Sequence, residues 1–168
     1  MSCPAPLTIT PASLPLQLQT ESCAQTEAFG AALARAYLQE PTALPPYIAL
    51  RGDLGVGKTA FVRGFASVTS PRSAVRSPTF ALVNEYRGQV PGAPSVFHFD
   101  MYRITDEDDL YSTGFFDYFD RDGIILCEWA VNIPYGLPEK YISVVIEKLG
   151  DDNRKIKISE KTNADFIS

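Results

Sequence analysis

The segment from residue 52 to residue 59 constrains the fold more than any other part of the chain. Its residues fill every fixed position of the pattern G-x-x-x-x-G-K-[ST], in which a glycine-rich turn binds phosphate groups. Glycines let successive backbone N–H groups approach phosphate oxygens, because a Cβ atom would block that approach. The pattern requires a strand before the loop and a helix after it. The eight residues are Gly52, Asp53, Leu54, Gly55, Val56, Gly57, Lys58 and Thr59.

The flanking residues have the patterns that this strand and helix need. Residues 47–50 form a short apolar run, and aromatic and aliphatic residues recur at helical spacing between 60 and 68. Lys58 would then add a positive charge, which we expect to be exposed in the loop. Thr59 would place a hydroxyl in the first helical turn, where a Mg²⁺ ion bridging two phosphates needs an oxygen ligand. The sequence therefore predicts a site for a nucleotide phosphate group with Mg²⁺.

Composition indicates the class of protein that carries this loop. The chain has 168 residues, 45% of them hydrophobic, and its mean hydropathy is −0.05. We therefore expect one globular P-loop domain over residues 1–168, with 1–13 as a loose lead-in and 161–168 as a C-terminal tail. The three cysteines have neither a disulfide framework nor zinc-ligand spacing. No apolar run is long enough to span a bilayer and no secretory leader is evident, so the expected location is the cytoplasm.

The remaining patterns predict alternating strands and helices. Residues 14–19 alternate like an edge strand, and Ser22 and Gln25 have the spacing of a helix capping box. Thr105 is the expected cap of a helix that Gly114 ends. Strands are expected at 47–50, 80–86, 96–100, 124–129, 141–147 and 154–159, and helices at 22–36, 60–68, 105–113 and 115–120. These elements predict an α/β fold of the P-loop NTPase kind, with a mixed sheet, a parallel centre, antiparallel hairpins and helices on both faces.

Two carboxylates stand where apolar runs end. Asp100 follows residues 96–99, and Glu128 follows residues 124–127. Ligands of open α/β sheets lie outside the carboxyl ends of the strands, so both side chains are candidates for the phosphate site. One of them would hold Mg²⁺ or its water, and the other would orient or deprotonate an attacking water. For either residue alone, a solvated carboxylate at a strand end remains the alternative.

Four further residues have both a functional and a structural interpretation. Thr79 lies in a polar loop from which a hydroxyl can sense a γ-phosphate, although a turn residue would look the same. His98 alternates with phenylalanines, and we interpret it as structural because no second metal ligand is suitably spaced. Trp129 is a core residue or a lid beside Glu128. The charge of Arg103 alone does not distinguish an ion pair from a phosphate contact.

Four blocks together resemble one known family. Residues 52–59, Ser-Pro-Thr-Phe at 77–80, His-Phe-Asp-Met-Tyr-Arg at 98–103 and Glu-Trp at 128–129 occur in this order. The chain thereby resembles the bacterial TsaE (formerly YjeE) family of ATPases over nearly its whole length. Many families share a phosphate loop, whereas the combination with the other three blocks is specific. Ala130 stands where the family often has proline after the Glu-Trp pair.

The resemblance implies an ATPase that uses Mg²⁺ and works with TsaD-like and TsaB-like proteins in making threonylcarbamoyladenosine on tRNA. It implies that Thr59 and Glu128 hold Mg²⁺. It also implies a catalytic role for Asp100 and a switch-like role for Thr79. The resulting catalytic set is Asp100, Lys58 and Thr79, and the ATP-binding set is residues 52–59 with Thr26 and Arg154, which correspond to family contacts from the first helix region and the last hairpin.

Three other functions are compatible with a phosphate loop. A small-molecule kinase shares the loop and the size range, but no basic lid segment is evident. A GTPase would need an N-K-x-D motif for guanine, and no asparagine of the chain begins one. A binding module with a purely structural nucleotide differs only in that it does not hydrolyse ATP. Transfer assays with phosphate acceptors and single-turnover hydrolysis separate these alternatives.

Charge and arginine placement predict how such an ATPase would work. No arginine is evidently aimed at the γ-phosphate unless Arg103 or Arg76 acts within the chain, so we expect slow hydrolysis by the isolated protein. The net charge of −5 argues against tRNA binding by this chain alone, because such binding depends on neutralising phosphates. Any influence on tRNA would pass through partner proteins. The expected contact with them lies near Thr79 and Trp129.

Overall fold

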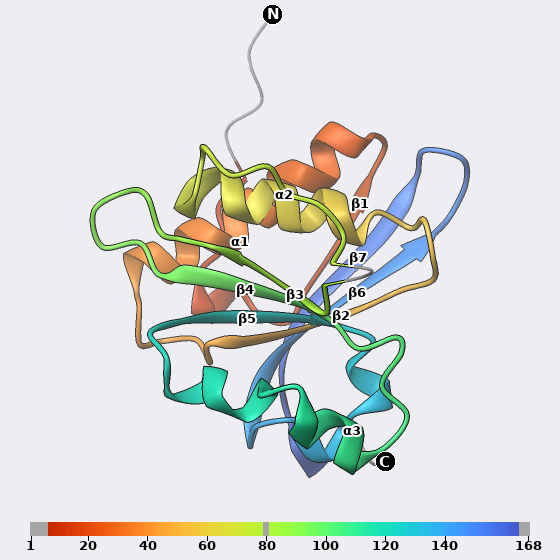
Figure 1. Cartoon of the computed structure of the whole chain (residues 1–168). Coiled ribbons are helices and arrows are strands. Elements are labelled where there is room, and N and C mark those ends of the chain that lie inside the picture. Colours follow the sequence, from red (N-terminus) through yellow and green to blue (C-terminus); the bar gives the residue numbers. More distant parts are fainter. Residues whose placement is uncertain (1–6, 79–80, 165–168) are drawn as a thin grey trace, which may run out of the picture.

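A mixed β-sheet runs through the middle of the molecule (Figure 1). The computed structural model describes residues 7–78 and 81–164, and within them seven strands follow the order β1-β7-β6-β2-β5-β4-β3. The strands are β1 (Leu16–Thr20), β2 (Tyr47–Arg51), β3 (Val83–Tyr86), β4 (Ser95–Asp100), β5 (Gly123–Glu128), β6 (Lys140–Lys148) and β7 (Arg154–Thr162).

The centre of the sheet is parallel and its margins are antiparallel. Strands β6, β2, β5 and β4 are parallel neighbours, whereas β3 pairs with β4, β7 with β6 and β1 with β7 in antiparallel fashion. The two predicted hairpins, β3–β4 and β6–β7, supply most of the antiparallel pairing. The predicted mixed sheet is therefore confirmed, and the carboxyl ends of β2, β4 and β5 lie at the same edge.

Helices cover both faces, as predicted. Helices α1 (Cys23–Gln39) and α2 (Lys58–Thr69) lie on one face in Figure 1, and α3 (Glu107–Ser112) lies on the other. Two apolar layers result, one containing Phe61 and Phe65 beneath the long helices and one containing Phe99 and Phe115 beneath α3. The short 3₁₀ helices are η1 (Pro11–Ser13), η2 (Phe115–Asp120), η3 (Ala130–Asn132) and η4 (Pro134–Gly136).

Two glycines set the close approach of α1 and α2. A Cβ atom on Gly30 would lie 2.0 Å from the carbonyl oxygen of Phe61, and one on Gly64 would lie 1.8 Å from that of Glu27. The helix backbones therefore contact each other directly, which only glycine permits. This contact fixes α2 over the sheet and with it the end of the phosphate loop.

Several local predictions need correction. Helix α3 begins one residue later than expected, because the side chain of Asp106, not of Thr105, accepts the hydrogen bond that caps the helix, from the backbone N–H of Asp109 at 2.7 Å. Strand β3 begins at Val83 because Leu82 has a left-handed φ of 66°. Ile9, in the expected loose lead-in, is buried in the core. Strand β7 also extends into the expected tail, to Thr162.

The start of α1 is close to the predicted capping box. The Ser22 side chain accepts a hydrogen bond from the Gln25 N–H at 3.2 Å. The Gln25 side chain reaches back to the N–H of Glu21, not to that of Ser22. In the part of the chain that the structure describes, no helix is long and apolar enough to cross a membrane.

Candidate active site at the carboxyl edge of the sheet

Side-chain alternation brings three polar residues to the face that α2 covers. Asp100 and Glu128 end β4 and β5 and are direct partners in the parallel register. His98 lies two residues before Asp100 and therefore points to the same face. Because β2 leads into the phosphate loop beside β5, this edge gathers the loop and both predicted carboxylates.

Backbone conformation explains the glycines of the phosphate loop. Gly52, Gly55 and Gly57 have φ values of 154°, 73° and 114°, which residues with a Cβ atom rarely adopt. At Gly52 space is also lacking, because a Cβ atom would lie 2.6 Å from the carbonyl oxygen of Ile146 on β6. The loop is therefore pressed against the sheet edge, while Asp53 and Leu54 at its tip are exposed.

Lys58 was predicted to be exposed, but the structure shows it buried. It is the first residue of α2, and only 6% of its surface is accessible. Its Nζ atom donates a hydrogen bond to the carbonyl oxygen of Gly52 at 2.5 Å and lies 4.8 Å from the centre of the Trp129 ring. The loop curls around the ammonium group and the indole covers it, so the charge is held at the centre of the site.

One cavity of about 560 Å³ joins the predicted residues. It lies between the phosphate loop and the ends of β4 and β5, and none of the described residues that line it is an arginine. Trp129, in a left-handed conformation with φ 58°, packs edge-on against the exposed Tyr102 ring at 5.1 Å and forms one wall. The lining residues are Leu54, Gly55, Gly57, Lys58, Thr59, Ser77, Asp100, Tyr102, Glu128 and Trp129.

Asp100 is oriented by the chain that follows it. Its Oδ1 atom accepts a hydrogen bond from the N–H of Tyr102 at 2.9 Å. Partial burial raises the pKa of Asp100 above its usual value, and the nearby Glu128 carboxylate raises it further. The Tyr102 N–H, His98 and Lys58 act in the opposite direction without cancelling the shift. A carboxylate with a raised pKa is the better proton acceptor.

Glu128 has a partner that the sequence interpretation missed. Its Oε2 atom lies 2.9 Å from Nε2 of His98, and both side chains are almost fully buried. The Nδ1 atom of His98 has no hydrogen-bond partner among the described residues. The available signal was the two-residue spacing of His98 and Asp100 on one strand, which puts both on the face of Glu128.

Thr26 and Arg154 approach the phosphate loop from its other side. Both line a smaller cavity of about 180 Å³ together with Gly55 and Gly57. The guanidinium of Arg154 donates from Nε to the carbonyl oxygen of Val56 at 2.7 Å and from one Nη atom to three carbonyls of the β6–β7 turn at 3.0 Å. Arg154 therefore braces the loop against that turn.

Arg103 and Arg76, the two candidate arginines, do not line the large cavity. Thr79 lies outside the described residues. Arg103 is exposed and does not line the large cavity. Arg76 is tied through its backbone N–H and carbonyl to the Tyr86 hydroxyl, at 3.2 and 3.1 Å. Within residues 7–78 and 81–164, no three His, Cys, Asp or Glu side chains are grouped to hold a metal ion.

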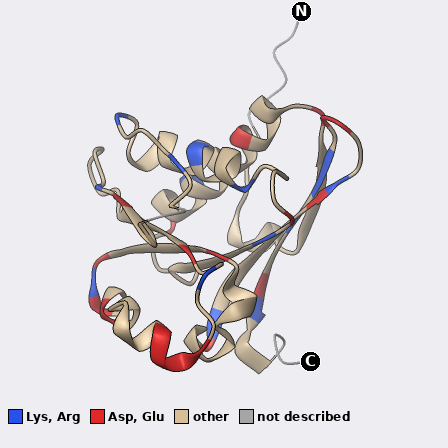
Figure 2. Cartoon of the chain, turned by 45° about the vertical axis from the view of Figure 1, so that its right-hand side comes forward, with Lys and Arg blue, Asp and Glu red and all other residues tan. Residues whose placement is uncertain are grey.

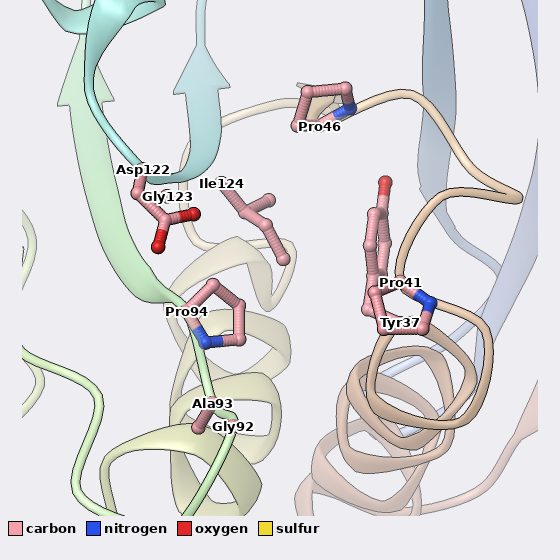
Figure 3. Close-up of a pocket in the computed structure, with 9 residues that line it drawn as sticks. All are labelled: Tyr37, Pro41, Pro46, Gly92, Ala93, Pro94, Asp122, Gly123 and Ile124. Atoms are coloured by element: carbon pink, nitrogen blue, oxygen red, sulfur yellow. The ribbon is translucent and has the colours of Figure 1, made fainter.

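A cavity of about 260 Å³ lies at the opposite, amino edge of the sheet (Figure 3). Tyr37 and Pro41 form one side, and Asp122 and Ile124 the other, with Pro94 below. No residue predicted to bind a nucleotide or a metal lines this cavity. The predicted site residues within the described part of the chain thus gather at the carboxyl edge alone.

Sequence comparisons find related proteins. A family model described as "Threonylcarbamoyl adenosine biosynthesis protein TsaE" matches residues 20–156. A TsaE protein of Bacillus subtilis is 39% identical over 116 residues, which are 69% of this chain and 70% of the relative. A TsaE protein of Haemophilus influenzae is 38% identical over 135 residues, 80% of this chain and 83% of the relative.

A solved structure is also similar. The crystal structure of YdiB from Bacillus subtilis superposes with a TM-score of 0.66 at 29% sequence identity, covering 90% of this chain and 88% of that one. The matched family region extends from the last residue of β1 to the third residue of β7 and so includes the phosphate loop, Asp100 and Glu128. The chain therefore belongs to the TsaE family of threonylcarbamoyl adenosine biosynthesis proteins.

Proposed function

We propose that the protein is a Mg²⁺-dependent ATPase that acts with TsaD-like and TsaB-like proteins in threonylcarbamoyladenosine modification of tRNA. The proposal rests on the cavity that joins the phosphate loop to the strand-end carboxylates Asp100 and Glu128. Membership of the TsaE family supports the biosynthetic role.

The loop and the start of α2 bind the phosphates of ATP. The backbone N–H groups of residues 52–59 and the amino end of α2 provide donors for phosphate oxygens. Lys58 is already oriented inside the loop, and its ammonium exchanges the Gly52 carbonyl for a phosphate oxygen. Thr26 and Arg154 complete the site from the other side of the loop.

Thr59 and Glu128 fit the requirements of a hard cation. A hydroxyl and a carboxylate are the oxygen ligands that Mg²⁺ prefers, and both side chains line the cavity. When bound, Mg²⁺ would neutralise charge that develops on the β- and γ-phosphates. The Glu128 side chain is almost fully buried beside His98, and Thr59 is placed by the first turn of α2.

Asp100 orients the attacking water and accepts its proton. The water oxygen forms a bond to the γ-phosphorus while the bond from that phosphorus to the β–γ bridging oxygen breaks, and ADP leaves with the bonding electrons. The Tyr102 N–H fixes one oxygen of Asp100, leaving the other for the water. The raised pKa of Asp100 suits proton acceptance.

Hydrolysis by the isolated chain is slow, because none of the described residues that line the cavity is an arginine. An arginine supplied by a partner raises such a rate by about 10³- to 10⁵-fold. Acidic residues gather on α3, whereas Lys and Arg are spread over separate elements (Figure 2), and the net charge is −5. The chain consequently reaches tRNA through its partners, with the neighbourhood of Trp129 and Thr79 as the contact.

The test compares ATP turnover by the chain alone, with unmodified tRNA, and with TsaD and TsaB added. Slow basal turnover that rises only with the two proteins is expected. Fast turnover by the lone chain, or tight tRNA binding by it at physiological salt, would contradict the proposal. Turnover that requires a small phosphate acceptor would identify a kinase, and ATP binding with no hydrolysis in any mixture would identify a binding module.

A further inference from the structure

We propose that His98 is a positioning residue that fixes the Glu128 carboxylate in the orientation in which it binds Mg²⁺. The proposal rests on the function proposed above, in which Glu128 is a metal ligand. It assigns a role to the only histidine of the chain, whose side chain is fully buried and touches Glu128 at 2.9 Å.

Burial makes this contact necessary. The Glu128 side chain is only 5% exposed, and an ionised carboxylate removed from water is costly unless hydrogen bonds compensate it. An ionised carboxylate can only accept hydrogen bonds, so Nε2 of His98 carries the proton that it donates to Oε2. His98 thereby holds one carboxylate oxygen, and the other remains for the cavity that Glu128 lines.

The position of His98 on the sheet determines the direction from which its imidazole contacts Glu128. His98 pairs with Leu126 in the β4–β5 register, and Asp100 pairs with Glu128. The imidazole therefore approaches Glu128 diagonally from the interior, while Asp100 stands beside it at the strand end. Metal-binding carboxylates are commonly oriented by such an outer hydrogen bond, and its loss typically costs about 10- to 100-fold in metal affinity.

The imidazole ring is itself held in place. The Tyr86 ring lies 6.4 Å away, centre to centre, with an interplanar angle of 40°. The Tyr86 hydroxyl is fixed by two hydrogen bonds to the backbone of Arg76. Packing thus fixes the direction of the Nε2–H bond, which a positioning role requires.

The test uses two polar substitutions that differ in reach. In His98→Gln the side-chain amide nitrogen can take the place of Nε2, whereas in His98→Asn it ends near the place of Nδ1 and falls short of Glu128. Val96→Ala is the matched control, because Val96 lies two residues earlier on β4, on the same face and fully buried, and does not line the cavity. Calorimetry measures ATP affinity in EDTA and the Mg²⁺ concentration that half-saturates the increase in affinity.

His98→Asn is expected to raise the half-saturating Mg²⁺ concentration about 10- to 100-fold while leaving ATP affinity in EDTA unchanged. His98→Gln is expected to stay within about threefold of wild type, and Val96→Ala to match wild type. In a Glu128→Ala background His98→Asn is expected to add nothing, since no carboxylate is left to position. Tm measurements verify that each variant is folded.

Three results would overturn the proposal, and they can be told apart. If wild-type ATP affinity depends on Mg²⁺ and His98→Asn shows the same dependence, the positioning role is wrong and the proposed function stands. If wild-type ATP affinity does not respond to Mg²⁺, both are wrong. A His98→Gln variant that is impaired as much as His98→Asn would also contradict positioning, because the restored hydrogen bond would then have no effect.

Discussion

The two edges of the sheet differ in whether their charged side chains are buried or exposed. At the carboxyl edge the Glu128 carboxylate pairs with His98 inside the protein, and the two side chains are only 5% and 0% exposed. Near the amino end of β5, Glu85 and Arg121 form an ion pair whose side chains are 44% and 46% exposed. The cavity at the amino edge is lined mainly by prolines, Tyr37 and Ile124.

This difference supports the proposal that the carboxyl edge is the active site. A folding chain gains nothing by burying Lys58, His98 and Glu128, since removing charged and polar groups from water costs free energy. A surface pair such as Glu85–Arg121 contributes little either way. Buried charge that converges on a cavity therefore requires a functional explanation, whereas the amino edge is explained by packing.

Lys58→Ala is expected to give the largest effect. Loss of the ammonium inside the loop should abolish ATP binding or hydrolysis, because it removes a preorganised charge from the proposed phosphate site. The fold should be retained. Steady-state turnover and Tm measure the two effects. Asp122→Asn, at the amino-edge cavity, is the control and should match wild type in both, and an equal loss there would erase the contrast between the edges.

Substitutions of Asp100 and Glu128 should change different quantities, turnover in the first case and metal binding in the second. Asp100→Asn is expected to lower kcat by about 10²- to 10⁴-fold with Mg²⁺–ATP binding retained. Glu128→Ala and Thr59→Ala should instead raise the Mg²⁺ requirement. Titrating Mg²⁺ against each variant measures both quantities. The reverse pattern would exchange the roles of Asp100 and Glu128.

The raised pKa of Asp100 gives a matching stability prediction. A carboxyl with a raised pKa binds its proton more tightly in the folded state, so ionisation opposes folding at neutral pH. Asp100→Asn is therefore expected to raise Tm at pH 7, and the gain should vanish as the pH falls below the ordinary aspartate range. Thermal unfolding across pH measures this effect, and a lower Tm at pH 7 would show that Asp100 stabilises the fold.

The same substitution at a glycine of each edge should have unequal effects. Gly52→Ala introduces a Cβ atom 2.6 Å from a backbone oxygen of Ile146 at φ 154°, so a loss of stability of about 1 to 3 kcal/mol and weaker ATP binding are expected. Gly92→Ala, at φ 76° with no atom within 4 Å, should cost about 1 kcal/mol and leave ATP binding unchanged. Chemical denaturation and calorimetry compare the two, and equal effects on ATP binding would contradict the contrast.

The smallest expected effect concerns the exposed pair. Hydrogen bonds from Arg121 and Tyr118 lower the pKa of Glu85 to about 2. A lowered pKa contributes stability that is present above the ordinary glutamate pKa and is lost as the pH falls from about 4.5 towards 2. Glu85→Gln should lower Tm by about 1 to 3 °C at pH 7 and by less at pH 3. Thermal unfolding at both pH values tests this, and a pH-independent change would point to packing alone.

Local patterns predicted the parts of the molecule that depend on local chemistry. The phosphate loop, the hairpins and the strand ends at Asp100 and Glu128 follow from glycine spacing and apolar runs. The cap of α3 is Asp106 and not the predicted Thr105, because two adjacent residues can both cap a helix and backbone geometry selects between them.

Other features depend on contacts between distant segments. The burial of Lys58 requires Trp129 to lie over it, and these residues are far apart in the sequence. The His98–Glu128 contact likewise needs the β4–β5 register, which a single sequence does not specify.

Amide hydrogen exchange with and without Mg²⁺–ATP tests the central claim most directly, because it reports both edges of one unmodified chain in a single measurement. We expect slower exchange at residues 52–59, 98–102 and 126–130, and no change at 88–94 and 121–123. Unchanged exchange at 52–59 under saturating Mg²⁺–ATP, or protection confined to the amino edge, would contradict the assignment of the site.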